Sequence, residues 1–209
     1  MIVIYRVSPY LSSNPNPLGT NKTNIIRYCF DSFKKALGNR KLVVISDAVN
    51  LGMGEVIVAD QGNVETFHQQ INYVCNLPNE EKVLLCEDDY DWKPEALDRM
   101  EEALDRFEIV TPYDHPGHYF EPRFQTPKEM HLIGQQVWRE APSTPLTFAC
   151  RAYVIKQNQD LIKSFGVRDH EMFVELSKLG LKVYAPVPSL ATHLVAGLLA
   201  PGWLLTDKT

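Results

Sequence analysis

The first 111 residues alternate between short apolar runs and amphipathic stretches. Continuous apolar runs occur at residues 2–5, 41–46, 56–59, 83–86 and 109–111. Between them, apolar positions recur at helical spacing over residues 20–37, 64–74 and 94–107. Strands that alternate with helices predict a mostly parallel sheet with helices on its faces. Because such sheets bind ligands beyond the carboxyl ends of their strands, we expect a functional site at that edge.

The second half of the chain has a different pattern. Residues 130–133 and 136–138 predict a hairpin or edge strands, and residues 147–150 and 182–185 predict two further strands. Residues 169–179 predict a helix that ends at Gly180. A mixed sheet is therefore expected. A length of 209 residues suits one domain of this kind.

Composition excludes several functional classes. The chain has 21 Lys and Arg residues against 26 Asp and Glu residues, a net charge of −5, and no basic run longer than a pair, which disfavours wrapping of nucleic acid. Four cysteines without a CxxC pair indicate reduced core residues. Apolar stretches all fall short of the ~18 residues of a membrane span. We expect a cytoplasmic protein without a membrane span.

Three acidic residues follow the apolar run at residues 83–86. Glu87, Asp88 and Asp89 repel one another unless a cation or a set of hydrogen-bond donors neutralises them. Mg²⁺ and Mn²⁺ prefer carboxylate oxygens together with substrate phosphates. The triplet therefore indicates a cation site. The alternative is a solvated acidic turn before a helix that opens at Pro94, with Asp91 helping to cap it.

Residues 83–90 resemble the acidic DxD or EDD motif of GT-A glycosyltransferases, metal-dependent enzymes that use nucleotide sugars. The resemblance implies a single α/β domain with the GT-A (Rossmann-like) fold, a mixed, mostly parallel central sheet flanked by helices. It also implies Mn²⁺ or Mg²⁺ and a nucleotide-sugar donor, a UDP-sugar on family frequency. Asp89 would be the main metal ligand, and Glu87 and Asp88 would approach the ribose or the sugar.

Two earlier segments fall in the family's order. Residues 43–47 resemble the second strand, whose terminal aspartate, here Asp47, contacts the nucleotide base in that family. A helix or turn cap is an equally good account of Asp47. The segment with Arg6, Ser8 and Pro9 takes the place of the first nucleotide-contacting loop. Residues 1–111 would then form the nucleotide-sugar-binding half.

A later segment, residues 167–173, resembles the acidic start of a helix that supplies the catalytic base in inverting GT-A enzymes. Asp169 is the candidate general base and Glu171 is the reserve, since a carboxylate near the acceptor hydroxyl can take its proton. The alternative for Asp169 is a helix N-cap. Residues 112–209 would form the acceptor and catalytic half together with a C-terminal tail.

The tail resembles the end of many GT-A domains over residues 188–193, which implies His193 as a second metal ligand. The apolar residues 194–203 must pack on the body of the protein or fold over a ligand. We hypothesise that this segment orders over the diphosphate, the alternative being a permanently packed tail. The HxxH spacing of His115 and His118 lacks the further ligands that zinc needs.

Three functions fit these patterns. The first is a hexosyl- or pentosyltransferase that moves a sugar to a hydroxyl acceptor, namely a saccharide, a glycoconjugate or a modified nucleic-acid base. The second is a nucleotidyltransferase on a related sheet, although residues 17–22 make a poor triphosphate loop. The third is a non-catalytic nucleotide-sugar-binding module. A nucleic-acid acceptor would need a local basic groove, for which the chain offers Arg123, Lys128, Arg139 and Arg151.

Overall fold

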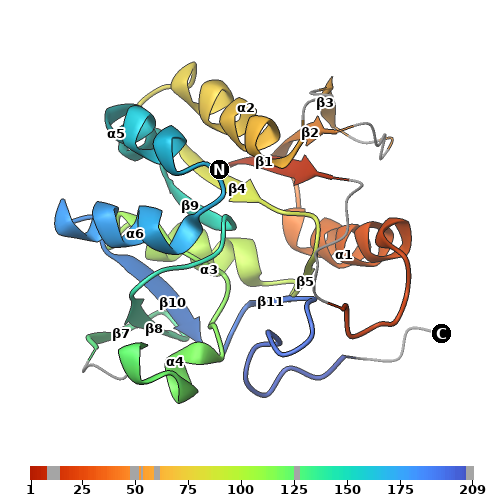
Figure 1. Ribbon diagram of the computed structural model, residues 1–209. Coiled ribbons are helices and arrows are strands. Elements are labelled where there is room, and N and C mark those ends of the chain that lie inside the picture. Colours follow the sequence, from red (N-terminus) through yellow and green to blue (C-terminus); the bar gives the residue numbers. More distant parts are fainter. Residues whose placement is uncertain (9–14, 48–51, 53, 59–61, 125–127, 206–209) are drawn as a thin grey trace.

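One mixed sheet organises the protein (Figure 1). The computed structural model describes residues 1–8, 15–47, 52, 54–58, 62–124 and 128–205. Within these residues the sheet has nine strands. Their spatial order is β3 (Glu55–Val58), β2 (Lys41–Ser46), β1 (Ile2–Val7), β4 (Lys82–Cys86), β9 (Phe148–Arg151), β6 (Ile109–Val110), β10 (Val183–Val187), β8 (Gln136–Ala141) and β7 (Met130–Ile133).

Strand direction changes across the sheet. Strands β3, β2, β1 and β4 are parallel to one another, and β6 is parallel to β10. Strand β9 lies antiparallel between β4 and β6, and β8 and β7 add an antiparallel hairpin at the far edge. The expected mixed α/β sheet flanked by helices is confirmed. The finer assignment to the GT-A fold stays a prediction.

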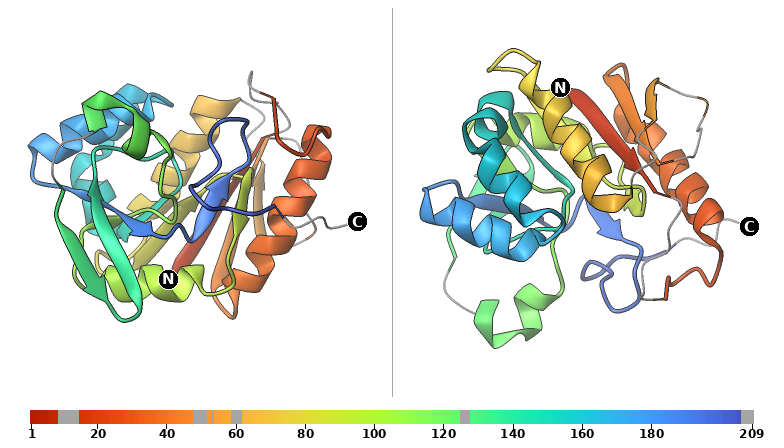
Figure 2. Two further views of the ribbon diagram at one scale, coloured as in Figure 1. Left: turned by 90° about the horizontal axis from the view of Figure 1, so that it is seen from below. Right: turned by 45° about the horizontal axis from the view of Figure 1, so that its top comes forward.

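Helices cover both faces of the sheet (Figure 2). Helices α1 (Lys22–Leu37) and α3 (Ala96–Ala103) pack on one face. The other face is covered by α2 (Asn63–Cys75), α5 (Ala152–Phe165) and α6 (Asp169–Lys178). A short helix, α4 (Gly117–Phe120), and a 3₁₀ turn, Pro122–Phe124, lie beyond the sheet edge. No described helix is long and apolar enough to cross a membrane.

The alternation of side chains along β1 creates the two halves of the core. Val3 and Tyr5 face α1, where the Tyr5 and Phe33 ring centroids are 5.0 Å apart, whereas Ile4 faces α2. Each such large apolar side chain contributes about 1.5–3 kcal/mol when fully buried. Strand β1 is therefore fixed in register, and its carboxyl end is held at a defined place beside those of β2 and β4.

Two parts of this architecture differ from the sequence-based expectations. Strand β3 was expected to be buried, but it is the outer strand of the sheet, and Val58 is 70% exposed there. The loop expected around His115 and His118 contains helix α4. Helix α5 was not expected from the sequence.

A second, two-stranded ladder joins distant parts of the chain. Strand β5 (Tyr90–Trp92) follows the acidic triplet, where the alternative interpretation placed a turn and a helix cap, and pairs antiparallel with β11 (Ala191–His193). Asp91 therefore belongs to a strand and does not cap α3. In the register of this ladder Tyr90 lies opposite His193. The ladder brings the C-terminal segment to the end of β4.

The tail after β11 packs on the body of the protein. The Leu194 amide donates to Asp89 O over 2.8 Å, and the Ala196 amide donates to Pro15 O over 2.8 Å. Leu194 is buried against Ile25 and Cys29 of α1. These contacts favour the packed alternative for the tail. Whether it also closes over a ligand stays a prediction.

Candidate functional site

The acidic triplet lies where β4 ends, and two of its carboxylates are paired with cations. Arg6 Nη2 on β1 donates to Glu87 Oε1 over 2.5 Å. Asp88 accepts from Lys22 Nζ over 2.5 Å and from the Ser8 amide over 2.8 Å. The triplet is thus a partly buried network, and the alternative of a solvated acidic turn is wrong.

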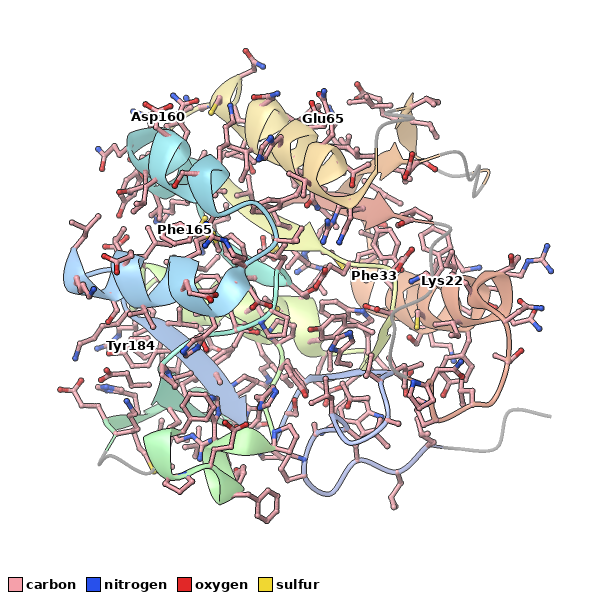
Figure 3. The ribbon with its side chains drawn as sticks, in the orientation of Figure 1. Lys22, Phe33, Glu65, Asp160, Phe165 and Tyr184 are labelled. Carbon is pink, nitrogen blue, oxygen red and sulfur yellow. The ribbon has the colours of Figure 1, made fainter. Side chains whose placement is uncertain are left out.

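Each of these cations is held in place by more than one element. Arg6 is 3% exposed, and it lies in β1, not in a loop; its Nη1 donates to Asn63 O at the start of α2 over 2.9 Å. Lys22 is the first residue of α1 (Figure 3). A cation at a helix N-terminus is disfavoured by the helix dipole, so the charge of Asp88 explains its burial there.

Asp89 pairs with His193 across the β5–β11 ladder. His193 Nε2 lies 3.2 Å from Asp89 Oδ2, and the imidazole stacks on Tyr90 with the ring centroids 4.9 Å apart. The other polar atoms of the pair, Asp89 Oδ1 and His193 Nδ1, are buried and have no hydrogen-bond partner among the described residues. Buried polar atoms are nearly always satisfied, so these two mark a place where a ligand can bind.

The protonation of the site follows from burial and pairing. Burial raises the pKa of Glu87 and of Asp88, although Arg6 and Lys22 act in the opposite direction. Burial also raises the pKa of Asp89, but the charge and hydrogen bond of His193 outweigh it and hold that pKa below its usual value. The same pairing raises the pKa of His193 against the effect of burial. Asp89 and His193 therefore form an ion pair.

The Asp89–His193 pair could hold a divalent cation only if a further ligand, such as a phosphate group, also binds that cation. The described residues contain no cluster of three or more His, Cys, Asp or Glu side chains that could hold a metal ion. Asp89 and His193 supply two adjacent donors, each with an unpartnered atom. Mg²⁺ is commonly bound by one or two carboxylates plus substrate phosphates. The donor set thus suits a cation that shares a phosphate group and displaces the His193 proton.

The other residues expected at the nucleotide lie at the ends of β1 and β2. Asp47 is 2% exposed, its amide donates to Val7 O over 2.9 Å, and its Oδ2 has no hydrogen-bond partner among the described residues. That oxygen can accept a hydrogen bond from a ligand. Ser8 contacts Asp88 through its amide. Pro9 lies outside the described residues.

Asp169 is the first residue of α6, and it does not cap that helix. Its Oδ1 accepts from the adjacent His170 amide over 2.6 Å, while Arg168 occupies the N-cap position. The N-cap alternative for Asp169 is therefore wrong. Burial raises the pKa of Asp169, which makes the carboxylate a stronger base. Glu171, the reserve base, is exposed on the first turn.

Asp169 and Glu171 line a cavity of about 390 Å³. His115, Phe124 and the tail residue Leu198 line it as well. The charge of His193 lowers the pKa of Asp169 against the effect of burial. The Tyr113 ring contacts both His115 and His193, with centroid distances of 5.5 and 6.4 Å. The two carboxylate groups thus share one edge of the sheet.

Sequence patterns did not identify every residue at this edge. Lys22 carries no local signal for its pairing with Asp88, since the two residues are 66 positions apart. Tyr113 and Phe124 belonged to an aromatic segment that also suits a hydrophobic core. The position of the Asn21 N-cap, whose side chain accepts from the Asn24 amide over 3.0 Å, was the one feature that marked the start of α1 beside the site.

No protein-family model matches the chain, and no curated protein matches it. Among solved structures, the bifunctional IspDF from Campylobacter jejuni has a TM-score of 0.47 and 12% identity over 88% of this chain and 48% of that one. This chain therefore spans about half the length of that protein.

Two further solved structures are similar to this chain over most of their own length. A 4-diphosphocytidyl-2C-methyl-D-erythritol synthase has a TM-score of 0.47 and 12% identity, over 86% of this chain and 85% of that one. A197 from STIV has a TM-score of 0.49 and 11% identity, over 100% of this chain and 99% of that one. With all three TM-scores below 0.5, these likenesses assign neither a family nor an activity to the chain.

Proposed function

We propose that the protein is a metal-dependent glycosyltransferase that moves a sugar from a nucleotide diphosphate to a hydroxyl acceptor. The observation that carries this proposal is the Asp89–His193 pair, which has two buried atoms without a hydrogen-bond partner among the described residues. The Tyr113 ring links this pair to the cavity that Asp169 lines, because it contacts both His193 and the lining residue His115. A phosphate-bound cation and a base are the two groups that sugar transfer from a nucleotide diphosphate needs.

On the donor side, Asp89 and His193 would hold Mn²⁺ or Mg²⁺ against the diphosphate. The cation, when bound, offsets the negative charge that grows on the leaving diphosphate. Asp47 Oδ2 accepts a hydrogen bond from the nucleotide, more often uridine than guanosine on family frequency. Arg6 and Lys22 keep Glu87 and Asp88 in fixed positions, where these carboxylates approach the ribose or the sugar.

On the acceptor side, Asp169 acts as the general base. Its carboxylate takes the proton of the acceptor hydroxyl while that oxygen bonds to the anomeric carbon. The bond from the anomeric carbon to the diphosphate breaks in the same step, and the diphosphate leaves with the bonding electrons. A single displacement of this kind inverts the anomeric configuration, and the raised pKa of Asp169 favours the proton transfer.

A thermal-shift screen of nucleotide sugars, with and without Mn²⁺, tests the donor half of this proposal. A ligand that binds only the folded state raises the Tm, so a donor should stabilise the protein only when Mn²⁺ is present. Asp89→Asn removes one charge and little volume, and it should abolish that Mn²⁺-dependent shift. A shift of equal size in EDTA would rule out the proposed cation.

The nucleotidyltransferase alternative draws on one observation, the two cations Arg6 and Lys22 beside the acidic triplet, which could face a triphosphate. Both cations are already paired with carboxylates, which favours glycosyl transfer. The products separate the alternatives. Glycosyl transfer releases a nucleoside diphosphate, nucleotidyl transfer releases pyrophosphate, and a non-catalytic binding module releases neither.

A further inference from the structure

The cavity beside Asp169 has an acidic lining. Asp169 and Glu171 both lie on it, and no described residue of its lining is Lys or Arg. An anionic group close to either carboxylate is repelled by it, because like charges at a protein surface are only partly screened. A phosphorylated acceptor would meet this repulsion, whereas an uncharged one would not.

The imidazole of His115, on the same lining, does not offset this charge. Burial, together with the neighbouring His118, lowers the pKa of His115 to about 4, and its Nδ1 accepts from the Gly117 amide over 2.9 Å. The neutral ring therefore carries its proton on Nε2. His118 Nδ1 lies 3.0 Å from Arg139 Nη2 and 3.3 Å from Asp114 Oδ1, so this imidazole belongs to the Asp114 network.

The remaining lining suits a polyol. Ser143 Oγ lies 2.8 Å from His170 Nδ1, which places a hydroxyl and an imidazole side by side on the cavity. Phe124 and Leu198 add apolar walls. A few polar groups among apolar walls are typical of small-molecule sites. Hydroxyl groups and C–H faces occur together on a saccharide, so this lining matches both.

None of the basic residues considered for a nucleic-acid acceptor is found among the described lining of the cavity beside Asp169. Arg151 pairs with Asp105 over 3.1 Å. Lys128 and Arg139 line a neighbouring cavity of about 320 Å³, and Arg139 also donates to Asp114. The side chain of Arg123 lies outside the described parts of the protein.

We propose that the cavity beside Asp169 binds an uncharged saccharide as the acceptor. The inference rests on the proposed glycosyl transfer, because it takes Asp169 as the base that faces the acceptor hydroxyl. The acidic lining disfavours a sugar phosphate and a nucleic acid in this cavity. The adjoining cavity shares His118 and Phe124 with the first one, so a disaccharide has room to extend across this boundary.

Binding can be measured without turnover. Saturation-transfer NMR on the full chain would compare uncharged mono- and disaccharides with the corresponding sugar 6-phosphates and with a short oligothymidine. We expect signals from the C–H protons of at least one uncharged saccharide. The matching sugar phosphate should bind at least ~10-fold more weakly because of the carboxylates.

Two substitutions locate the binding. Phe124→Leu keeps an apolar wall but loses the ring, and it should weaken saccharide binding about 3- to 10-fold. The control is Phe120→Leu. Phe120 is the last residue of α4, four residues before Phe124, and its ring is 79% exposed, so it should contribute nothing to saccharide binding. Glu171→Lys reverses the charge of an exposed side chain and should strengthen sugar-phosphate binding at least ~10-fold.

The outcomes separate this inference from the proposed function. Saccharide binding that is weakened in Phe124→Leu and unchanged in Phe120→Leu supports the inference. Stronger binding of the sugar phosphate or the oligonucleotide to the wild-type protein overturns it. Donor turnover without any saccharide binding also overturns it and leaves glycosyl transfer standing. Saccharide binding in a protein that binds no nucleotide sugar supports the cavity and removes the transferase.

Discussion

Two groups of carboxylates lie at the same edge of the sheet, and they differ in whether a cation is paired with them. At the end of β4, each residue of the triplet has its own cation, Arg6 for Glu87, Lys22 for Asp88 and His193 for Asp89. Asp169, at the start of α6, lines an open cavity. Within the described structure, the hydrogen bond found for its side chain comes from the neighbouring His170 amide.

This difference in pairing suits the triplet to positioning a ligand and Asp169 to taking a proton. A buried carboxylate that is paired with a cation is fixed in place, since removal of the partner would leave an uncompensated charge. Burial raises the pKa of Asp169 as it does those of Glu87 and Asp88, but Asp169 lines a cavity that a substrate can enter, so it can take a proton from that substrate. The β4 end is thus suited to hold a charged donor in one pose, and the α6 start is suited to chemistry on an acceptor.

The largest expected effect is that of Asp89→Ala. Loss of the cation should lower donor turnover by roughly 1,000-fold or more, because a metal supplies several kcal/mol of charge stabilisation. Release of nucleoside diphosphate measures it. Asp31→Ala, an exposed aspartate on α1, is the matched control. Full activity of the Asp89 variant would show that the positioned triplet serves the fold alone.

Next in size is the effect of Asp169→Asn, which keeps the shape of the side chain and removes its basicity. Acceptor-dependent turnover should fall at least ~100-fold, while the donor-induced shift in Tm persists. The product of the wild-type enzyme should have an inverted anomeric configuration. Retention of configuration, or an active variant, would contradict the role of Asp169 as the base.

The pH profile sharpens the same point. A base acts only when it is deprotonated, and burial raises the pKa of Asp169. The acid limb of kcat/KM should therefore lie above the ordinary aspartate pKa of about 3.9, with activity lost as the pH falls through the raised value. An acid limb at or below the ordinary value would place Asp169 outside the rate-determining proton transfer.

A smaller effect is expected from Leu194→Ala in the tail that separates the two groups. Leu194 is buried against α1, so the truncation should cost about 2–3 kcal/mol of unfolding free energy in the ligand-free protein. Leu204→Ala, at a side chain that is 83% exposed, should change it by less than about 0.5 kcal/mol. Equal unfolding curves for both variants, together with rapid proteolysis after residue 193, would show that the tail is a mobile cover and not a packed part of the fold.

The smallest expected effect is that of Asp47→Ala. Loss of one hydrogen bond from a carboxylate to the nucleotide should weaken donor affinity about 10-fold, with little change in turnover at saturating donor. Asp47→Asn keeps the acceptor oxygen and should recover part of the affinity. Unchanged donor binding in the alanine variant would remove Asp47 from the donor site.

Local patterns predicted the strands and helices that have a regular apolar period. Strands β1, β2 and β4 and helices α1 and α2 lie within a few residues of the expected bounds, because burial on one side fixes the period of each. Helix α5 was missed because the polar run at residues 156–160 separates its apolar positions, although Ile155 and Ile162 keep helical spacing across the kink at Asn158. The exposure of β3 depends on its place in the strand order, which the run itself does not encode.

The candidate site was predictable where a motif is contiguous in sequence. The carboxylates of the triplet and of the α6 start are visible as short acidic runs, and His193 was proposed through the family resemblance. Their partners were not visible. Strands β5 and β11 have three residues each, too few to show a period, and their pairing joins positions that are about a hundred residues apart. Lys22 meets Asp88 only in three dimensions.

The ion pair between Asp89 and His193 can form only late in chain synthesis, because His193 belongs to β11. Arg6, Lys22, Glu87 and Asp88 all belong to the first half of the chain and can pair as soon as it has left the ribosome. Residue 193 arrives only after β10 has joined the sheet and the chain has turned back to β5. Until then Asp89 has no imidazole beside it. Under the proposed function, a nascent or truncated chain that lacks β11 should therefore be unable to hold the donor.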